Sequence, residues 1–296
     1  MHFIPHNLRG PALMAAATCA FAINDSMMKL ATVGLPPMQV LFMRGVAATL
    51  WCLPLVLLLG YGKQLHRVFD RWVLLRNAFE LVAVLLFVLA LAKMPIADIT
   101  AIGQITPLVF ILGMALIMRE KIGGLRTGLI ALGFAGALLV AQPTGQGISI
   151  YALFGFASAI LCAARDIVGR KVPADLPGWI LAFCAILMVM AGAGIASLFT
   201  EQWLLPQLHH VALLVGAGFF LMFGHFCLFT AYRVGEAGSV APFYYMFSVW
   251  ALISGVVVFQ TLPNALALTG IAFILASGLL IVLVDGRKRR LMAAAT

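Results

Sequence analysis

Charged residues are scarce in this chain of 296 residues: Asp, Glu, Lys and Arg together make up 10% of it, whereas 64% is hydrophobic. A soluble domain usually carries about a quarter charged residues. The shortage excludes an ordinary soluble fold and makes the lipid bilayer the better solvent for the chain. The formal net charge of +9 does not indicate a nucleic-acid partner, because the basic residues sit between long apolar runs and form no basic stripe interleaved with aromatics.

Motifs that carry chemistry are also missing. The five cysteines lie inside apolar runs and form no CxxC pair, which disfavours a metal site or a disulfide framework. The six histidines make no HExxH spacing, and no P-loop or cofactor fingerprint occurs. We therefore predict no metal, no cofactor and no enzyme, with a membrane-embedded enzyme as the non-transporter alternative. A channel would need rings of charges or carbonyls, which the sequence does not suggest.

Long apolar runs, in contrast, fill the chain. A spanning helix needs about 20 mostly apolar residues, and ten runs qualify: 10–32, 37–60, 73–93, 97–118, 125–142, 149–169, 178–200, 210–232, 238–261 and 265–284. Short connections, many with Gly or Pro, separate the runs, as is typical of helix ends. The sequence predicts an all-α integral membrane protein with ten transmembrane helices.

Lys and Arg gather at alternate connections. With the N-terminus placed inside the cell, sixteen of the nineteen Lys and Arg residues lie at the cytoplasmic side, and only Lys29, Arg44 and Lys93 do not. The reverse orientation would violate the positive-inside rule at nearly every loop. We predict a multi-pass protein of the bacterial inner (plasma) membrane with both termini cytoplasmic.

The second half of the chain repeats the first. The segment Ala22–Asp25, followed by Lys29, returns 141 residues later as Ala163–Asp166, followed by Arg170. Each half holds five helices, and because five is odd the second half enters the membrane from the opposite side. We predict an inverted repeat with halves 1–145 and 146–296, the second ending in a basic cytoplasmic tail. Inverted repeats are common in secondary transporters, whose site lies near the midplane between the halves.

The order of short motifs resembles the drug/metabolite transporter superfamily, in its ten-helix branch with two EamA domains. The resemblance covers almost the whole chain and rests on Asn24-Asp25 with Lys29, Pro37 to Arg44, Leu75-Arg76, Ala90-Leu91, Met94 to Asp98, Thr106 to Leu108, Glu120, Gly133 to Gly136, and Pro143. The opening pattern is similar to the subgroup with S-adenosylmethionine and riboflavin uptake carriers, and exporters of amino acids and of opine-type metallophores belong to the same family. The resemblance implies a cavity formed mainly by the third, fourth, eighth and ninth helices, with help from the first and sixth.

This sequence departs from the family pattern in two places. Gln260 stands where a Glu often follows the ninth helix, and Asn77 stands where a small residue often follows the Leu-Arg pair, with Glu80 behind it. These changes weaken any transfer of a substrate from relatives.

Two acid–base spacings inside the apolar runs are candidates for coupling or gating. Ionisable groups are costly in a bilayer and need a partner or a wet surface. Asp25 and Lys29 stand four residues apart, and Asp166 and Arg170 repeat that spacing. The interpretation as a proton- or gate-related pair competes with that of a structural pair near a helix end.

The remaining polar residues in the runs are candidates for substrate binding. Asn24 and Arg44 are the first two of these candidates along the chain. The planar guanidinium of Arg44 can bind a carboxylate or phosphate through two hydrogen bonds, and the alternative is a pair with Asp25. Glu80 is the leading candidate for proton coupling or for binding a substrate cation, with pairing to Arg76 as the alternative. Asn77 falls on a similar face one turn earlier.

Gln104, His225 and the deep aromatic residues complete the candidates. Gln104 lies near mid-depth before a proline that frees a backbone carbonyl. His225 can titrate near neutral pH, and the alternative is a packed hydrogen-bonding group. At least one of Tyr244, Tyr245 and Trp250 is expected to face the cavity and to stack on a flat substrate.

Together these features predict a secondary active transporter. Its substrate is expected to be a small organic metabolite, amino-acid-derived, vitamin or nucleoside-like, moved by alternating access with proton or exchange coupling. An exporter of amino acids or of an opine-type metallophore is the alternative. The expected partners are the small-molecule substrate and membrane lipid. The small-residue face that begins with Gly124 and Gly128 packs within the monomer or, alternatively, forms a homodimer.

Overall fold

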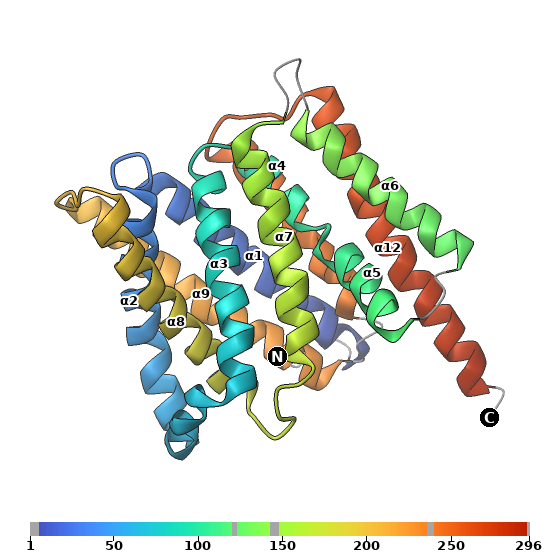
Figure 1. Cartoon of the computed structure of the whole chain (residues 1–296), viewed down its shortest axis with the longest axis horizontal. Coiled ribbons are helices and arrows are strands. Elements are labelled where there is room, and N and C mark those ends of the chain that lie inside the picture. Colours follow the sequence, from blue (N-terminus) through green and yellow to red (C-terminus); the bar gives the residue numbers. More distant parts are fainter. Residues whose placement is uncertain (1–5, 120–122, 143–147, 236–239, 295–296) are drawn as a thin grey trace.

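The computed structural model describes residues 6–119, 123–142, 148–235 and 240–294, and every regular element within these ranges is a helix (Figure 1). The first half contains α1 (His6–Ala31), α2 (Pro37–Leu58), the 3₁₀ helix η1 (Tyr61–Phe69), α3 (Arg71–Leu91), α4 (Ile96–Gly103), α5 (Thr106–Met118) and α6 (Gly124–Ala141). The second half contains α7 (Ile150–Gly169), α8 (Gly178–Thr200), α9 (Leu208–Val234), the 3₁₀ helix η2 (Ala241–Tyr245), α11 (Met246–Val257) and α12 (Ala265–Ala294). Glu120, Lys121 and Pro143, which the family pattern and the charge count used, lie outside the described residues.

Seven of the described helical segments are long and apolar enough to cross a membrane. The helix α1 falls short because Asn24, Asp25 and Lys29 lower its hydropathy, and α6 and the η2–α11 segment are shorter apolar helices. With these three included, helices occupy all ten predicted spans. The prediction of an all-α membrane protein is thereby confirmed.

Two of the predicted spans are broken. The run 97–118 was expected as one helix, but α4 ends at Gly103 and α5 begins at Thr106. Pro107 has no N–H and cannot bond the carbonyl four residues earlier. The Thr106 hydroxyl donates to that Gly103 carbonyl at 2.7 Å instead. The run 238–261 is likewise divided, into η2 and α11.

A connection at one end of the bundle contains the unpredicted helix η1, which leads directly into α3. Asp70 ends η1 and caps α3 by accepting the N–H of Trp72 at 2.8 Å. Arg67 of η1 forms an ion pair with Asp175 in the α7–α8 connection. The hydrogen bond from the Arg67 guanidinium lowers the pKa of the Asp175 carboxyl from its ordinary value. The pair therefore stays ionised in mildly acidic solution.

The most extensive helix contacts join helices from opposite halves: α1 packs on α9, α3 on α7, α2 on α8, and α6 on α12. In Figure 1, α6 and α12 lie side by side at one edge, and α2 and α8 lie at the other. Exchanging the halves turns the α1–α9 contact into the α7–α3 contact and leaves α2–α8 and α6–α12 as self-pairs. The two halves therefore interleave along an internal two-fold relation.

Glycines bring α6 and α12 into close contact. A Cβ added to Gly136 would come within 2.6 Å of the Gly270 carbonyl, and one added to Gly133 would meet the Ser277 hydroxyl. These buried glycines do not belong to the predicted small-residue face that begins with Gly124 and Gly128. Gly124 and Gly128 are exposed with nothing near their Cβ positions, and the homodimer stays a prediction.

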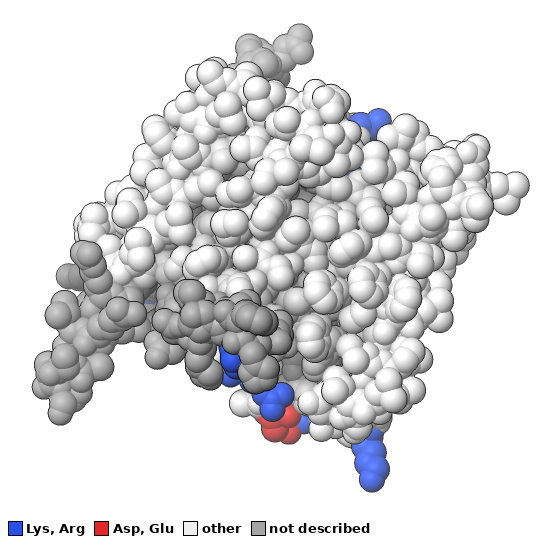
Figure 2. Space-filling view, turned by 180° about the vertical axis from the view of Figure 1, so that it is seen from behind, with Lys and Arg blue, Asp and Glu red and all other residues white. Residues whose placement is uncertain are grey.

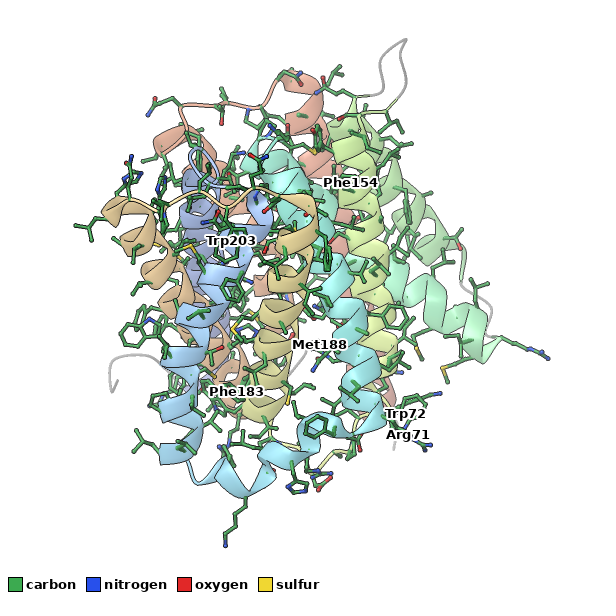
Figure 3. All side chains as sticks on the ribbon, turned by 60° about the vertical axis from the view of Figure 1, so that its left-hand side comes forward. Arg71, Trp72, Phe154, Phe183, Met188 and Trp203 are labelled. Carbon is green, nitrogen blue, oxygen red and sulfur yellow. The ribbon has the colours of Figure 1, made fainter. Side chains whose placement is uncertain are left out.

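The broad face of the molecule shows almost no charge. In Figure 2 the coloured side chains lie along the rims, and the wide middle of this face is white. Arg71 and Trp72 lie at one end of the bundle and Trp203 toward the other (Figure 3). The Lys171 ammonium lies 4.6 Å from the Trp72 ring centroid. Such aromatic and basic side chains are typical of membrane interfaces.

Candidate functional site

A cavity of about 620 Å³ lies between the two halves. Its walls come from α1, α2, α3, α4, α5, α7, α8, α9, η2 and α11. These include all six helices that the family resemblance implies, joined by the second and seventh spans. The polar lining residues are Asn24, Asp25, Arg44, Arg76, Glu80, Thr100, Gln104, Thr106, Ser158, Arg165, Asp166, His225, Tyr232 and Tyr244. The cavity size is typical of a small-molecule site.

One end of the lining is an ion-pair cluster around Glu80 of α3. The Glu80 carboxylate accepts a hydrogen bond from Arg165 of α7 at 2.8 Å and lies 3.3 Å from an Arg76 nitrogen one turn earlier. Arg165 also contacts the Asp166 carboxylate at 2.8 Å. The side chains of Glu80, Arg76 and Arg165 are 17–20% exposed, so the cluster is partly buried and satisfies its own charges. Both the expected contact with Arg76 and an unexpected one with Arg165 are present.

The α1 side of the lining is polar but not ion-paired. Asn24 donates its amide N–H to Asp25 Oδ1 at 2.8 Å, and Asp25 is 7% exposed. In the part of the chain that the structure describes, Asp25 has no Lys or Arg nitrogen within 4.0 Å, so the alternative pair of Arg44 with Asp25 does not form. The buried Nε of Arg44 has no hydrogen-bond partner among the described residues. These groups are directed at the cavity that they line.

The expected pair of Asp25 with Lys29 is wrong. Lys29 donates from Nζ to the carbonyls of Leu91 and Met94, both at 2.6 Å, and lies 5.7 Å from the Phe259 ring centroid. The carbonyl of Leu91 belongs to the last turn of α3, where the negative end of the helix dipole favours a cation. Lys29 thus joins the end of α1 to the end of α3 and does not line the cavity.

The expected pair of Asp166 with Arg170 is also wrong. Asp166 lines the cavity and forms an ion pair with its sequence neighbour Arg165. Arg170 lies 5.5 Å from the Phe110 ring centroid, with a long contact to the Met114 sulfur at 3.9 Å. The four-residue spacing therefore does not decide the partner of Asp166, because the adjacent Arg165 on the same helix contacts its carboxylate.

Three other predicted binding residues lie outside the cavity. Asn77 is buried and accepts a hydrogen bond from Arg76 at 2.7 Å, so it helps to position Arg76 in the ion-pair cluster. Tyr245 packs toward α12, where a Cβ on Gly278 would overlap its ring. Trp250 is half-buried, and its indole nitrogen has no partner among the described residues.

His225 and Tyr244 do line the cavity. The His225 ring bonds through Nδ1 to the Leu221 carbonyl at 2.8 Å, and its edge meets the Phe21 ring at a centroid distance of 5.2 Å. The bond to a carbonyl requires a proton on Nδ1, which leaves Nε2 as an acceptor for other partners. Phe87 and Phe247 add aromatic surface to the same walls.

Sequence reasoning missed Arg165 as a site residue. It counted this residue only among the cytoplasmic cations, although Arg165 stands where Asn24 stands in the first half. The internal repeat was therefore the signal that could have placed Arg165 in the cavity, opposite its counterpart.

Comparison with known proteins identifies the family. The model of the EamA-like transporter family matches twice, over residues 8–142 and 149–283. The chain belongs to the EamA-like transporter family. This assignment confirms the resemblance to the drug/metabolite transporter superfamily and makes the chain a multi-pass membrane transporter with two repeats, not an enzyme.

Individual relatives cover nearly the whole chain. A riboflavin transporter of Vibrio cholerae serotype O1 is 28% identical over 96% of each chain. The pseudopaline exporter CntI of Pseudomonas aeruginosa strain UCBPP-PA14 is 26% identical over 88% of this chain and 91% of its own. The S-adenosylmethionine uptake transporter of Rickettsia prowazekii is 25% identical over 88% of each. A solved crystal structure with 15% identity aligns at a TM-score of 0.65 over 94% of this chain and 98% of its own, which supports the fold.

Proposed function

We propose that this EamA-like transporter is a secondary carrier that binds a small organic metabolite in the cavity between its halves. One observation carries the proposal: a cavity of about 620 Å³ at the seam of an inverted repeat has walls that combine charges, amides and aromatic rings. Carriers of this architecture bind their substrates at such seams. The volume fits an organic molecule of vitamin or nucleoside size.

Alternating access is supported by two cations that the repeat relates to each other. Lys29 and Arg170 occupy equivalent positions in the two halves. Lys29 bonds the carbonyls at the end of α3, whereas in the described chain Arg170 makes no hydrogen bond to the corresponding end of α9. In an inverted repeat the two positions lie on opposite sides of the membrane. We propose that the access change exchanges these roles, so that Lys29 releases α3 when Arg170 engages α9.

The moving units in this proposal are not the halves of the sequence. The halves interleave through α1–α9 and α3–α7 contacts. Rocking residues 1–145 as one body against 146–296 would separate these packed interfaces. We propose instead that each moving unit contains helices of both halves, with the repeat boundary near residue 145 serving as a connection.

For coupling, we propose Asp25 rather than Glu80 as the proton carrier. Glu80 was the leading candidate, but its carboxylate has two arginine contacts, and each would resist protonation. Asp25 lines the cavity with Asn24 as its hydrogen-bonding neighbour and no cation within 4.0 Å among the described residues. Exchange of one solute for another is the alternative source of energy.

We propose the bacterial inner membrane as the location, with both termini cytoplasmic. The beginning of α1 and the end of α12 both lie toward the lower side of Figure 1. The aromatic and basic side chains Arg71, Trp72 and Lys171 lie near the end of the bundle where the positive-inside rule places the cytoplasm.

Direction is the second open choice, and the relatives differ in it. One is named a riboflavin transporter, one an S-adenosylmethionine uptake transporter and one a pseudopaline exporter. We propose uptake of a vitamin-like or nucleoside-like metabolite as the first hypothesis. Export of an amino-acid-derived solute through the same cavity is the alternative.

Reconstitution into proteoliposomes tests the carrier proposal. Vesicles preloaded with unlabelled riboflavin, uridine or an amino-acid mixture should accelerate uptake of the matching labelled solute, and that uptake should saturate. Counterflow of this kind requires a binding site that alternates between the two sides. A flux that rises linearly with concentration, without counterflow for any solute, would overturn the proposal.

A further inference from the structure

Three uncharged side chains in the cavity wall have hydrogen-bonding atoms that no protein group satisfies. Both amide atoms of Gln104, the hydroxyl of Thr100 and the carbonyl oxygen of Asn24 are buried without a partner in the described chain. The three residues are only 1%, 2% and 3% exposed, and all line the cavity. Buried polar atoms are ordinarily hydrogen-bonded, and leaving one unpaired destabilises the protein.

We infer that Gln104, Thr100 and Asn24 form an amide-reading edge, which binds an uncharged planar group that presents a hydrogen-bond donor beside an acceptor. This inference rests on the proposed function and names the part of the substrate that the carrier recognises. The chemical class is a lactam, imide, ureide or primary carboxamide.

The local fold explains why Thr100 and Gln104 lie together. Thr100 precedes Gln104 by one helical turn, so the two side chains share a face of α4. Gln104 stands at the break before α5, where its N–H closes α4 on the Thr100 and Ala101 carbonyls. Neighbouring polar groups do not compete for the side chain, because Thr106 is occupied with the Gly103 carbonyl. The break in the fourth span therefore leaves the Gln104 amide available to a ligand.

The donor and acceptor types decide the ligand class. A glutamine amide offers one N–H donor and one carbonyl acceptor side by side, and it pairs with a group that shows the complementary arrangement, as in its bidentate contacts with adenine. Thr100 adds a hydroxyl that donates or accepts, and Asn24 adds an acceptor. A carboxylate brings only acceptors and an ammonium only donors, so each would leave part of this edge unpaired.

The amide-reading edge is absent from the second half. The repeat places Tyr244 at the position of Gln104, so the second half presents a phenol to the cavity where the first half presents an amide. The ion-pair cluster of Glu80 with Arg165 stands elsewhere in the wall and has no hydrogen bond to Gln104. The site is therefore asymmetric, and the substrate binds with its uncharged planar end toward α4.

Binding measurements with purified protein in detergent test the inference. The probes are matched pairs: uridine and 3-methyluridine, riboflavin and 3-methylriboflavin, nicotinamide and nicotinate. We expect at least one imide or carboxamide probe to bind. Its partner, in which the donor is methylated or replaced by a carboxylate oxygen, should bind at least 10-fold more weakly, because a site built on hydrogen bonds rejects analogues that leave its groups unpaired.

The matched variants are Gln104→Leu and Gln202→Leu. Gln202 is exposed in the α8–α9 connection and carries the same chemical change outside the cavity. Gln104→Leu should weaken binding of the preferred probe at least 10-fold while its melting temperature stays equal to or above that of the wild type, because it removes no hydrogen bond within the protein. Gln202→Leu should bind as the wild type does.

Several results would overturn the inference. These are equal binding of both members of every pair, binding by Gln104→Leu at wild-type strength, or a Gln104→Leu protein that melts several degrees lower as its binding falls. Failure of every imide and carboxamide probe would also overturn it. Saturable counterflow of a solute that has no imide or carboxamide group, unchanged in Gln104→Leu, would refute the inference but support the carrier proposal. Binding of an imide without any counterflow would do the opposite.

Discussion

The Glu80 carboxylate holds two arginines together, and Glu80→Gln is expected to destabilise the protein. The substitution keeps the size of the side chain but removes the charge that faces Arg165 at 2.8 Å and Arg76 at 3.3 Å. Removing one partner of a buried pair costs about 3–5 kcal/mol. Because these side chains are 17–20% exposed to the cavity, we expect a cost just below that range, about 2–3 kcal/mol. A chain of this size should then melt roughly 4–12 °C lower.

Thermal unfolding in detergent, followed by tryptophan fluorescence, measures this effect. Arg165→Gln alone should also lower the melting temperature, because it leaves Glu80 and Asp166 without their shared cation. The double variant Glu80→Gln/Arg165→Gln should be destabilised less than the two single effects added together, with a coupling energy of about 1–3 kcal/mol. Asp175→Asn removes one charge from an exposed pair and should lower the melting temperature far less than Glu80→Gln does. If Glu80→Gln melts like the wild type, or if the single effects simply add, the cluster does not hold the site together.

Three further predictions concern gating, coupling and pH. The gating test uses a variant whose only cysteine is Cys162, which lines the cavity. In this background Lys29→Met should speed the labelling of Cys162 by an impermeant maleimide added from outside, because the two hydrogen bonds that join α1 to α3 are lost. An unchanged labelling rate would show that Lys29 is not part of the gate. Asp25→Asn should abolish uptake driven by a pH gradient but retain counterflow, and full gradient-driven uptake in this variant would exclude Asp25 as the proton carrier. The lowered pKa of Asp175 means that its stabilising ion pair is complete above the ordinary aspartate pKa of about 3.9 and is lost as the pH falls through the lowered pKa. The difference in melting temperature between wild type and Asp175→Asn should therefore stay constant from pH 7 to pH 5. A difference that already shrinks in this pH range would refute the lowered pKa.

The sequence was sufficient for the helices but not for their partners. Apolar runs of spanning length locate ten segments because the bilayer imposes one length on all of them. Pro107 indicated a freed backbone carbonyl, but the division of that span into α4 and α5 was not predicted. The ion pairs were another matter, because Glu80 and Arg165 are 85 residues apart and meet only after the halves interleave.

Local spacing misled where tertiary contacts compete. The four-residue spacing of Asp25 and Lys29 permits a pair within α1, but the carbonyls at the end of α3 take the ammonium. Tyr244 and Tyr245 differ for a related reason, since neighbouring residues of a 3₁₀ helix, which has three residues per turn, face directions about 120° apart. One ring therefore lines the cavity and the other packs toward α12. The sequence contains no information on which neighbour turns inward until the packing partners are known.

The charged lining residues balance in number. Arg44, Arg76 and Arg165 face the same cavity as Asp25, Glu80 and Asp166, so in their ordinary ionised forms the described walls sum to zero. A membrane potential of 100 mV acts on each unbalanced elementary charge with about 2.3 kcal/mol. Reorientation of the empty site should therefore depend little on the membrane potential. The current across the membrane of reconstituted vesicles would then report only the charge of the substrate and of any accompanying proton.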